Sequence, residues 1–273
     1  MSNVKRFGFG ANWLKFQRAV GPEQIAAAQQ SLGEMFSNTS FSGRTFLDAG
    51  CGSGLFSVAA SRLGAMVTCF DFDEQSVQST RELCSRTLGT EAPAPVRGDL
   101  VDRHWMRGLG RFDFVYCWGV AHHTGSMWKA IENACGAVDE QGQLCLAIYN
   151  RQAVMTPIWK AVKALYTVVP RPLKWILASS YFLPMLAVDR VRVFFAKPGH
   201  RAAARGMSLW HDAVDWVGGY PFEAATPEQI TAFCADQGLV LLSSKTTRGH
   251  GCNEFLFART AKPPAANQQG DTR

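Results

Sequence analysis

Several patterns that define common protein classes are missing from this chain of 273 residues. It contains no Gly-Lys-Ser or Gly-Lys-Thr, which excludes a Walker phosphate loop. Its eight cysteines form no Cys-x-x-Cys pair, and four of them (51, 69, 117 and 145) lie in or beside predicted strands. We interpret them as buried, reduced thiols of a cytoplasmic protein.

Long apolar runs are missing as well. The N-terminus has a basic start without the apolar region of a secretory signal, so we expect no such signal. The apolar stretch 175–188 has fourteen residues, is interrupted by Pro184, and is shorter than the ~20 residues that span a bilayer. Residues 261–273 are rich in Pro, Gln and small side chains, and we expect them to be disordered.

The chain is 47% hydrophobic, and short apolar strands alternate with helical patterns. Strands are expected near 45–48, 66–71, 94–97, 112–118, 143–149, 239–246 and 254–259, and helices near 55–64, 74–87, 126–138, 152–168 and 227–237. This alternation predicts an α/β fold, in which helices cover both faces of a doubly wound, mostly parallel sheet.

The most informative stretch is Asp48-x-Gly50-x-Gly52-x-Gly54, which follows the first strand and opens a helix. Glycines at every second position let the backbone pass within contact distance of a ligand, where any Cβ would collide. The second strand ends in Asp71, and an acid there can accept both hydroxyls of a ribose. These features predict a nucleotide-type cofactor site, with a spacing that differs from the dinucleotide fingerprint Gly-x-Gly-x-x-Gly.

This pattern resembles motif I and its successor in the class I S-adenosylmethionine (SAM) methyltransferases, over about 44–150 and, by topology, over 227–259. The resemblance implies a seven-stranded sheet with a final antiparallel hairpin, and SAM as cofactor. Gly50, Gly52 and Gly54 would make room for the methionine part and the ribose. Asp48 would fix the loop and receive the ammonium group, and Asp71 would bind the ribose hydroxyls.

The same resemblance assigns the adenine end of the cofactor. Phe72 is placed to lie against adenine, and Asp99 matches the acid that accepts the adenine amino group, with the N–H of Leu100 beside it. Asp99 could instead only cap a turn. We also expect Trp118, at the end of the fourth strand, to contact SAM, and Trp13 of an N-terminal arm to cover it.

A loop with two adjacent histidines follows the fourth strand, and it resembles the histidine loop of the ubiquinone-pathway O-methyltransferases and their small-molecule relatives. Ligands of open α/β sheets lie at the carboxyl ends of the strands, so this loop faces the transferable methyl group. Either His122 or His123 could remove the acceptor's proton, or one could cap the next helix while the other packs against SAM. Tyr149 and Asp212 are the next candidates.

Other methyltransferase types fit less well. The divalent-metal catechol type places acids at the ends of the fourth and fifth strands, and none is there, so we expect no metal. Cys117–Val120 lacks the Pro-Pro-Tyr-type motif of the adenine-N6 and cytosine-N4 enzymes. The loop 207–223 is rich in aromatic and ionisable residues, which is typical of a binding wall, and its acids Asp212, Asp215 and Glu223 could orient the acceptor or pair with basic side chains.

Residues 151–205 carry ten Lys or Arg against one acid, Asp189, a formal charge of +9, whereas the rest of the chain sums to −3. We expect this basic and apolar insert to form a helical cap over the site. It could touch a membrane surface or attract an anionic substrate, or its charges could merely keep an apolar helix pair in solution.

We therefore expect five segments: an arm and helix over the cofactor (1–43), a SAM-binding Rossmann core (44–150), the cap with its substrate loop (151–226), a C-terminal helix and hairpin (227–260) and a disordered tail (261–273).

The predicted function is metal-independent transfer of a methyl group to a small or lipid-like metabolite, at oxygen. The alternatives are C- or N-methylation of an anionic amphiphile (a prenyl diphosphate or prenylated quinone precursor) or a sugar intermediate, and methylation of RNA or protein. Nucleic acid is disfavoured because no basic stripe interleaved with aromatics is evident. The oligomeric state stays open.

Overall fold

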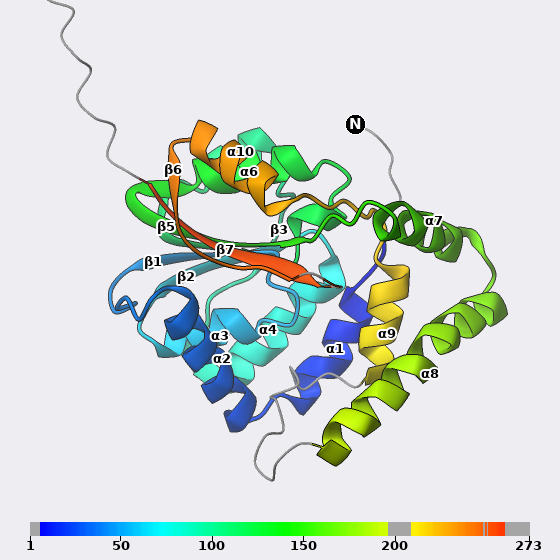
Figure 1. Cartoon of the computed structure of the whole chain (residues 1–273). Helices are drawn as coiled ribbons and strands as arrows, with labels where there is room; N and C mark the ends of the chain where they lie inside the picture. The colour runs from blue at the N-terminus through cyan, green and yellow to red at the C-terminus, as the bar shows by residue number, and fades with distance from the viewer. Residues whose placement is uncertain (1–5, 196–208, 248, 250, 260–273) are drawn as a thin grey trace, which may run out of the picture.

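The computed structural model describes residues 6–195, 209–247, 249 and 251–259, and it has helices on both faces of one sheet (Figure 1). The predicted tail 261–273 and the part of the basic insert at 196–205 lie outside the described residues. For residues 188–195, 209, 211 and 212, which lie in helices, the structure describes the backbone but not the side chains.

The sheet has seven strands in the order β3-β2-β1-β4-β5-β7-β6. Their bounds are β1 (Thr45–Ala49), β2 (Met66–Asp71), β3 (Val96–Arg97), β4 (Phe112–Trp118), β5 (Val138–Tyr149), β6 (Leu239–Lys245) and β7 (Cys252–Arg259). The first five strands pair in parallel, and β7 pairs antiparallel with both β5 and β6. The doubly wound, seven-stranded α/β sheet with a final hairpin is thus confirmed. The third strand is shorter than predicted, because only Val96 and Arg97 pair with the end of β2.

The central strands are apolar on both sides because helices cover both faces of the sheet. In β4, Phe114 and Tyr116 pack on one face, and Val115 and Cys117 pack on the other. All eight cysteines are free thiols; seven are buried and Cys252 is half-buried. They fill small apolar positions, as the sequence predicts.

Two helical layers flank the sheet. One face carries α1 (Gly10–Ala19), α2 (Pro22–Met35), α3 (Leu55–Arg62) and α4 (Glu74–Leu88); the other carries α5 (Arg103–Gly108), α6 (Met127–Gly136) and α10 (Pro227–Asp236) (Figure 1). The short 3-10 turns η1 (Gly89–Glu91) and η2 (Ala121–His123) follow α4 and β4.

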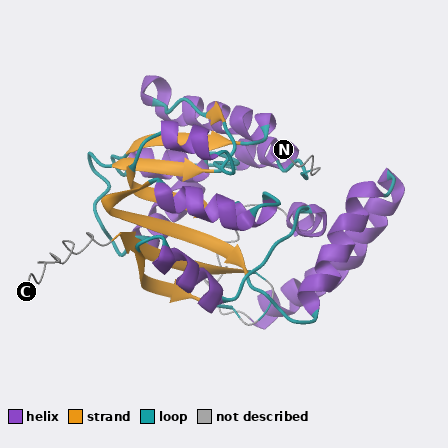
Figure 2. Cartoon of the chain, turned by 90° about the horizontal axis from the view of Figure 1, so that it is seen from above, coloured by secondary structure: helices purple, strands orange, loops and turns teal. Residues whose placement is uncertain are grey.

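The cap consists of α7 (Met155–Val168), α8 (Arg171–Phe195) and α9 (Leu209–Gly218), and it lies to one side of the sandwich (Figures 1 and 2). Tyr166, Ala178 and Val217 form its own small core. Pro184, which interrupts the apolar run in the sequence, lies inside a helix and does not end it, since α8 continues through it. Among the helices that the structure describes, none is long and apolar enough to cross a bilayer.

The N-terminal arm joins the core to the cap. The N–H of Phe7 donates to the carbonyl of Tyr220 at 2.7 Å, and the Phe7 ring lies 6.3 Å from the ring of Tyr166. Asn12 of α1 donates to Asp215 of α9 at 2.6 Å. The arm therefore runs between α9 and the carboxyl ends of the strands, where the candidate site lies.

Candidate active site

A cavity of about 1200 Å³ extends from the carboxyl ends of β1 and β2 to the cap. Its walls come from the loops after β1, β2, β3 and β4, from β5, and from α1 and α9, and it also extends along α2, β6 and β7. Among the predicted site residues whose side chains the structure describes, all except Gly54 line it. The fold thus brings together in one space side chains that are more than a hundred positions apart in the chain.

The glycine loop joins β1 to α3, and its three glycines all have positive φ. At Gly52, φ is +53°, and an added Cβ would lie 3.3 Å from the indole of Trp13. A side chain at this position would combine backbone strain with crowding. The covering ring predicted from α1 is therefore in place over the loop.

Asp71 bonds this loop, and Asp48 bonds the helix α3 that follows it. Asp48 is buried and accepts the hydroxyl proton of Ser57 at 2.6 Å; burial raises the pKa of its carboxyl to about 7. Asp71 accepts the N–H of Gly52 at 3.0 Å and that of Asp73 at 2.9 Å, and burial raises its pKa to about 6. The backbone of Phe72 bonds Asp71 as well, and since a carboxylate has about four lone-pair positions, one stays open for a hydroxyl of a ribose.

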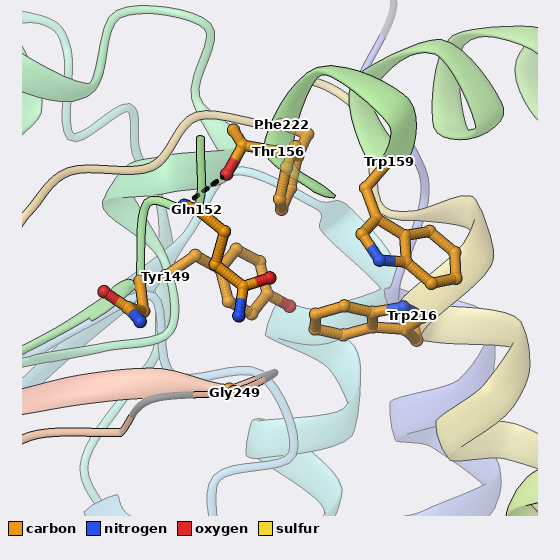
Figure 3. A pocket seen from close by; sticks show the side chains of 9 residues that line it. Tyr149, Gln152, Thr156, Trp159, Trp216, Phe222 and Gly249 are labelled. Atoms are coloured by element: carbon orange, nitrogen blue, oxygen red, sulfur yellow. Dashed lines mark hydrogen bonds between the residues drawn. The ribbon is translucent and has the colours of Figure 1, made fainter. Parts of the chain in front are cut away.

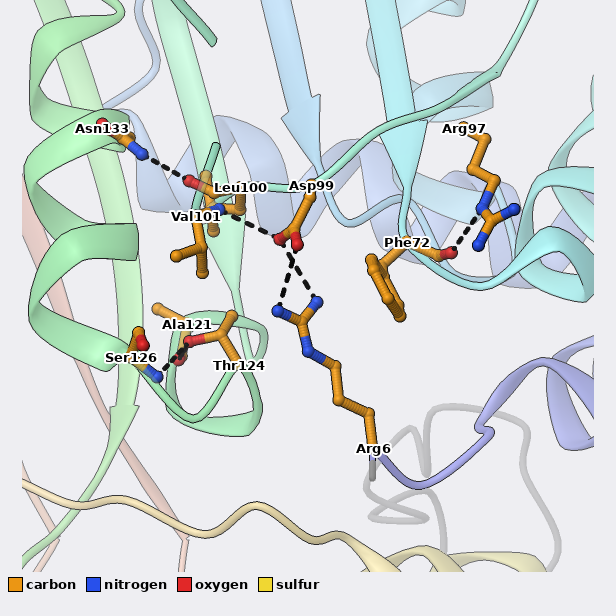
Figure 4. A network of polar contacts seen from close by, with 10 residues as sticks. All are labelled: Arg6, Phe72, Arg97, Asp99, Leu100, Val101, Ala121, Thr124, Ser126 and Asn133. Carbon is orange, nitrogen blue, oxygen red and sulfur yellow. Dashed lines mark hydrogen bonds and ion pairs between the residues drawn. The ribbon is translucent and has the colours of Figure 1, made fainter. Parts of the chain in front are cut away.

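Phe72 and Asp99 lie together, as predicted, but with a third residue (Figure 4). The guanidinium of Arg6 donates to both carboxylate oxygens of Asp99, at 3.2 and 3.1 Å, and lies 4.0 Å from the centroid of the Phe72 ring. Asp99 also accepts the N–H of Val101 at 3.1 Å, and the carbonyl of Leu100 accepts from Asn133. The arm thus reaches the place assigned to adenine.

The two histidines bind backbone groups. His122 is 1% exposed; its Nδ1 accepts the N–H of Tyr149 at 3.4 Å, and the backbone of Ala147 bonds the ring as well. His123 has Nδ1 2.9 Å from the carbonyl oxygen of Pro221, and the backbone of Gly219 also bonds its ring. The rings are thus engaged by the main chain, an arrangement that favours a structural role for both over that of a general base.

Burial and a nearby cation also weaken these histidines as bases. Burial, and after it the charge of Lys163, lower the pKa of His123 to about 3. The pKa of His122 falls well below its usual value, through burial and the charges of His123 and Lys163. Both rings are therefore neutral at neutral pH and accept a proton poorly.

Tyr149 ends β5 and forms part of the cavity wall beside the histidines. Its ring centroid is 3.9 Å from that of His122, 5.2 Å from Trp216 and 5.3 Å from Phe222. Figure 3 shows Tyr149 and Trp216 beside Phe222 and Trp159, around a small pocket next to the main cavity. Asp212 belongs to α9, but its side chain lies outside those that the structure describes.

The other acids of the loop 207–223 have distinct partners. Glu223 accepts the N–H of Met127 at 3.0 Å and so binds the N-terminus of α6. The charge of Lys160 in the basic insert also acts on Glu223, in line with the suggested pairing with the insert. Asp215 accepts from Asn12 and lines the cavity, as expected for a binding wall. Within the described residues, no group of three or more His, Cys, Asp or Glu side chains could hold a metal ion.

Two contributors to the site were not predicted from the sequence. Arg6 pairs with a residue 93 positions away, which no local pattern can indicate. Lys163 was counted only as one charge of the basic insert, yet it is fully buried beside the aromatic wall. A signal for it exists: Trp159 and Tyr166 lie four residues before and three after it, so an aromatic helix face carries this lysine.

The chain matches a family model described as a methyltransferase domain over residues 22–191. It is 26% identical over 119 residues to the ubiquinone biosynthesis O-methyltransferase of Glaesserella parasuis serovar 5 (strain SH0165), covering 41% of this chain and 48% of the relative. It is 32% identical over 111 residues to the enzyme of the same name from Methylobacterium sp. (strain 4-46), covering 40% and 42%. The matched part is therefore less than half of these relatives' length.

Among solved structures, the fold is similar to the magnesium protoporphyrin IX methyltransferase of Synechocystis PCC 6803 with bound SAM. The TM-score is 0.52 at 15% identity, over 86% of this chain and 79% of that one. Such a likeness shows the fold. The residues of the cavity fit the cofactor too, since the positive-φ glycine loop leaves room for a nucleoside and Asp71 has a lone pair open to a ribose hydroxyl. Because the family model matches more than half of the chain, this protein belongs to the class I SAM-dependent methyltransferases, whose cofactor is S-adenosylmethionine.

Proposed function

We propose that this protein transfers a methyl group from SAM to an oxygen atom of a small or lipid-like acceptor, without a metal ion. The main observation behind this proposal is that one cavity contains both sides of such a site. The glycine loop after β1 and Asp71 at the end of β2 line it, and so does Tyr149 at the end of β5. The cavity of about 1200 Å³ has room for a cofactor and an acceptor together. The two relatives named above are O-methyltransferases and match this chain over part of their length. They support oxygen as the acceptor atom.

Within this cavity, SAM supplies an already activated methyl group when bound. The glycine loop and Asp71 bind the nucleoside, while Trp13 covers the loop and excludes water from it. The acceptor lies against the acceptor wall, which we define as Tyr149 and Trp216. Alignment is the main contribution of such a wall to the rate. Because both histidines are neutral and bound to the backbone, we propose an acceptor whose hydroxyl is itself acidic, such as a phenol or an enol.

The surface of the cap supports a lipid-like acceptor. Exposed large apolar side chains gather there: Val154, Ile158, Leu165, Val168, Leu173, Trp175, Ile176 and Leu183. Lys160 and Arg171 are exposed among them, and the sequence has no Asp or Glu from 141 to 188. Exposed apolar side chains beside exposed basic ones are typical of helices that lie on an anionic membrane surface. We propose that the cap binds such a surface peripherally, on the cytoplasmic side, and takes its acceptor from it.

The function can be tested with SAM that carries ¹³C in its methyl group. The purified protein is incubated with a lipid and small-molecule extract, with total RNA and with a protein extract, and each fraction is recovered. We expect label in the lipid and small-molecule fraction, with the carbon shift of a methoxy group. Label in RNA or protein, or a C-methyl or N-methyl shift, would overturn the acceptor class or the acceptor atom.

A further inference from the structure

Lys163 of α7 is completely buried, although lysine is rarely buried unless its charge is paired. Its ammonium group donates a hydrogen bond to the carbonyl of Trp216. It lies 4.6 Å from the ring centroid of Trp216, 4.9 Å from that of Phe222 and 5.8 Å from that of Tyr149. Removing an ammonium group from water costs free energy that a Met or Leu at this helix position would not incur. The buried charge therefore indicates that Lys163 does more than pack in the cap.

The position of Lys163 suggests that role. Tyr149 and Trp216, two of the three rings that contact the ammonium, form the acceptor wall of the cavity. Lys163 thus lies one layer of side chains behind the acceptor. A charge acts strongly over such a distance when no water separates it from its target. The field of Lys163 already lowers the pKa of His122 and of His123 on the same side of the cavity.

Lys163 has charged and titratable groups of α7, α9 and η2 around it. Asp215 of α9 is the acid whose charge favours the ammonium form, and burial lowers the pKa of Lys163 to about 7. The histidines of η2 are neutral, and Tyr166 on α7 has a raised pKa, so it stays protonated. Beside Tyr149, the charge of Lys163 acts on both histidines, so this part of the acceptor wall is electropositive while Lys163 is charged.

We propose that Lys163 is a positioning residue whose buried positive charge makes the acceptor bind as an oxyanion against Tyr149 and Trp216. The proposal rests on the proposed function, because it concerns the acceptor side of the same cavity. A cationic acceptor is excluded, since Lys163 already occupies the ring faces that would bind an ammonium group.

The oxyanion makes a base at the site unnecessary. The acceptor's hydroxyl proton leaves to solvent on binding. A lone pair of the oxyanion then forms the bond from oxygen to the methyl carbon, while the bond from that carbon to sulfur breaks and its electron pair stays on sulfur. The products are the methyl ether and S-adenosylhomocysteine (SAH). This sequence agrees with two histidines that accept protons poorly.

The test uses 4-nitrophenol as probe, because its phenolate and phenol forms have different absorption spectra. It is titrated into the protein saturated with SAH, across a range of pH. Four variants are compared with the wild type: Lys163→Gln, which keeps a donor for the Trp216 carbonyl, Lys163→Met, Lys163→Arg and, as the matched control, Lys160→Gln on the exposed side of the same helix.

We expect the wild type, Lys160→Gln and Lys163→Arg to bind the phenolate, with the ionisation of the bound probe shifted to lower pH. In Lys163→Gln and Lys163→Met, phenolate affinity should fall about tenfold or more, which is one unit of pKa. An unchanged spectral shift in both neutral variants would overturn the proposal, as would a wild type that binds the phenol form or binds no probe. SAH affinity is measured calorimetrically on the same samples. Retained SAH binding shows that a variant is folded, and a wild type that fails to bind SAH would instead contradict the proposed function.

Discussion

Arg6 and Asp99 form a two-point ion pair, and the carbon of the same guanidinium lies over Phe72, 4.0 Å from its ring centroid. A planar group that stacks on Phe72 and donates to Asp99 does what the adenine of SAM is expected to do at these two residues. The guanidinium and the adenine therefore compete for one place. The arm has to release Asp99 before the nucleoside can bind there.

Removing Arg6 should thus tighten binding of the cofactor. For Arg6→Ala we expect the dissociation constant of SAH to fall about two- to fivefold, since a half-exposed ion pair contributes about 0 to 1 kcal/mol. Isothermal titration calorimetry measures it. Arg44→Ala, which removes the ion pair with Asp113 at the start of β1, is the matched control and should leave the constant unchanged. Weaker SAH binding by Arg6→Ala would show that Arg6 assists the cofactor.

The buried carboxyl of Asp48 should make stability depend on pH. Its pKa is about 7 in the folded protein, above the usual value of about 4, so folding takes up a proton between these two values. Stability from this group is therefore lost as pH rises from about 4 to about 7. Asp48→Asn keeps an oxygen for Ser57 and does not titrate. At about pH 8 the variant should be more stable than the wild type by on the order of 2 to 4 kcal/mol.

Urea unfolding of the two proteins at about pH 4, 6 and 8 measures this difference, and the advantage of Asp48→Asn should vanish at the lowest pH. Asp71, whose pKa is raised to about 6, is present in both proteins and largely cancels. A stability difference that does not change with pH would contradict the burial of an ionisable Asp48.

Replacing the two histidines should have different effects on the unfolding free energy and the same effect on the pH dependence of methyl transfer. His122→Ala leaves a cavity and unpairs the N–H of Tyr149, so we expect a loss of about 2 to 4 kcal/mol in unfolding free energy. His123 is only partly buried, and His123→Ala should cost less. Neither variant should remove a kinetic limb near pH 6.5 from methyl transfer, because neither ring titrates there. Loss of such a limb in His123→Ala would restore the general-base hypothesis.

The cap surface should bind anionic membranes. The Trp175 side chain is 64% exposed on α8, and Trp175→Ser should weaken sedimentation with vesicles that contain phosphatidylglycerol by about tenfold, since burying a large apolar side chain contributes about 1.5 to 3 kcal/mol. Trp128→Ser, which changes an exposed tryptophan of α6 outside the cap, is the control. Binding should weaken as salt is added. Equal binding to vesicles of phosphatidylcholine alone would argue against a role for the basic side chains.

The sequence predicts those parts of the site that depend on neighbouring residues in one element. The glycine loop after β1 and Asp71 at the end of β2 are local patterns, and the parallel sheet brings their ends to one edge. Arg6 and Lys163 depend on contacts across 93 and 53 positions, and such contacts exist only after the arm and α7 have packed. The histidines were found by position, but their role follows from Pro221 and Tyr149, which lie in distant segments.

The central claim is that the cavity over the glycine loop binds SAM, and calorimetric titration of SAM into the purified protein tests it most directly. We expect the wild type to bind, Gly52→Val to show no binding because a side chain at φ +53° meets the indole of Trp13, and Asp71→Ala to lose roughly 1 to 3 kcal/mol. Gly136→Val, at a helix end with no atom within 4 Å of the added Cβ, should bind as the wild type does. Equal affinity of the wild type, Gly52→Val and Asp71→Ala would contradict the account.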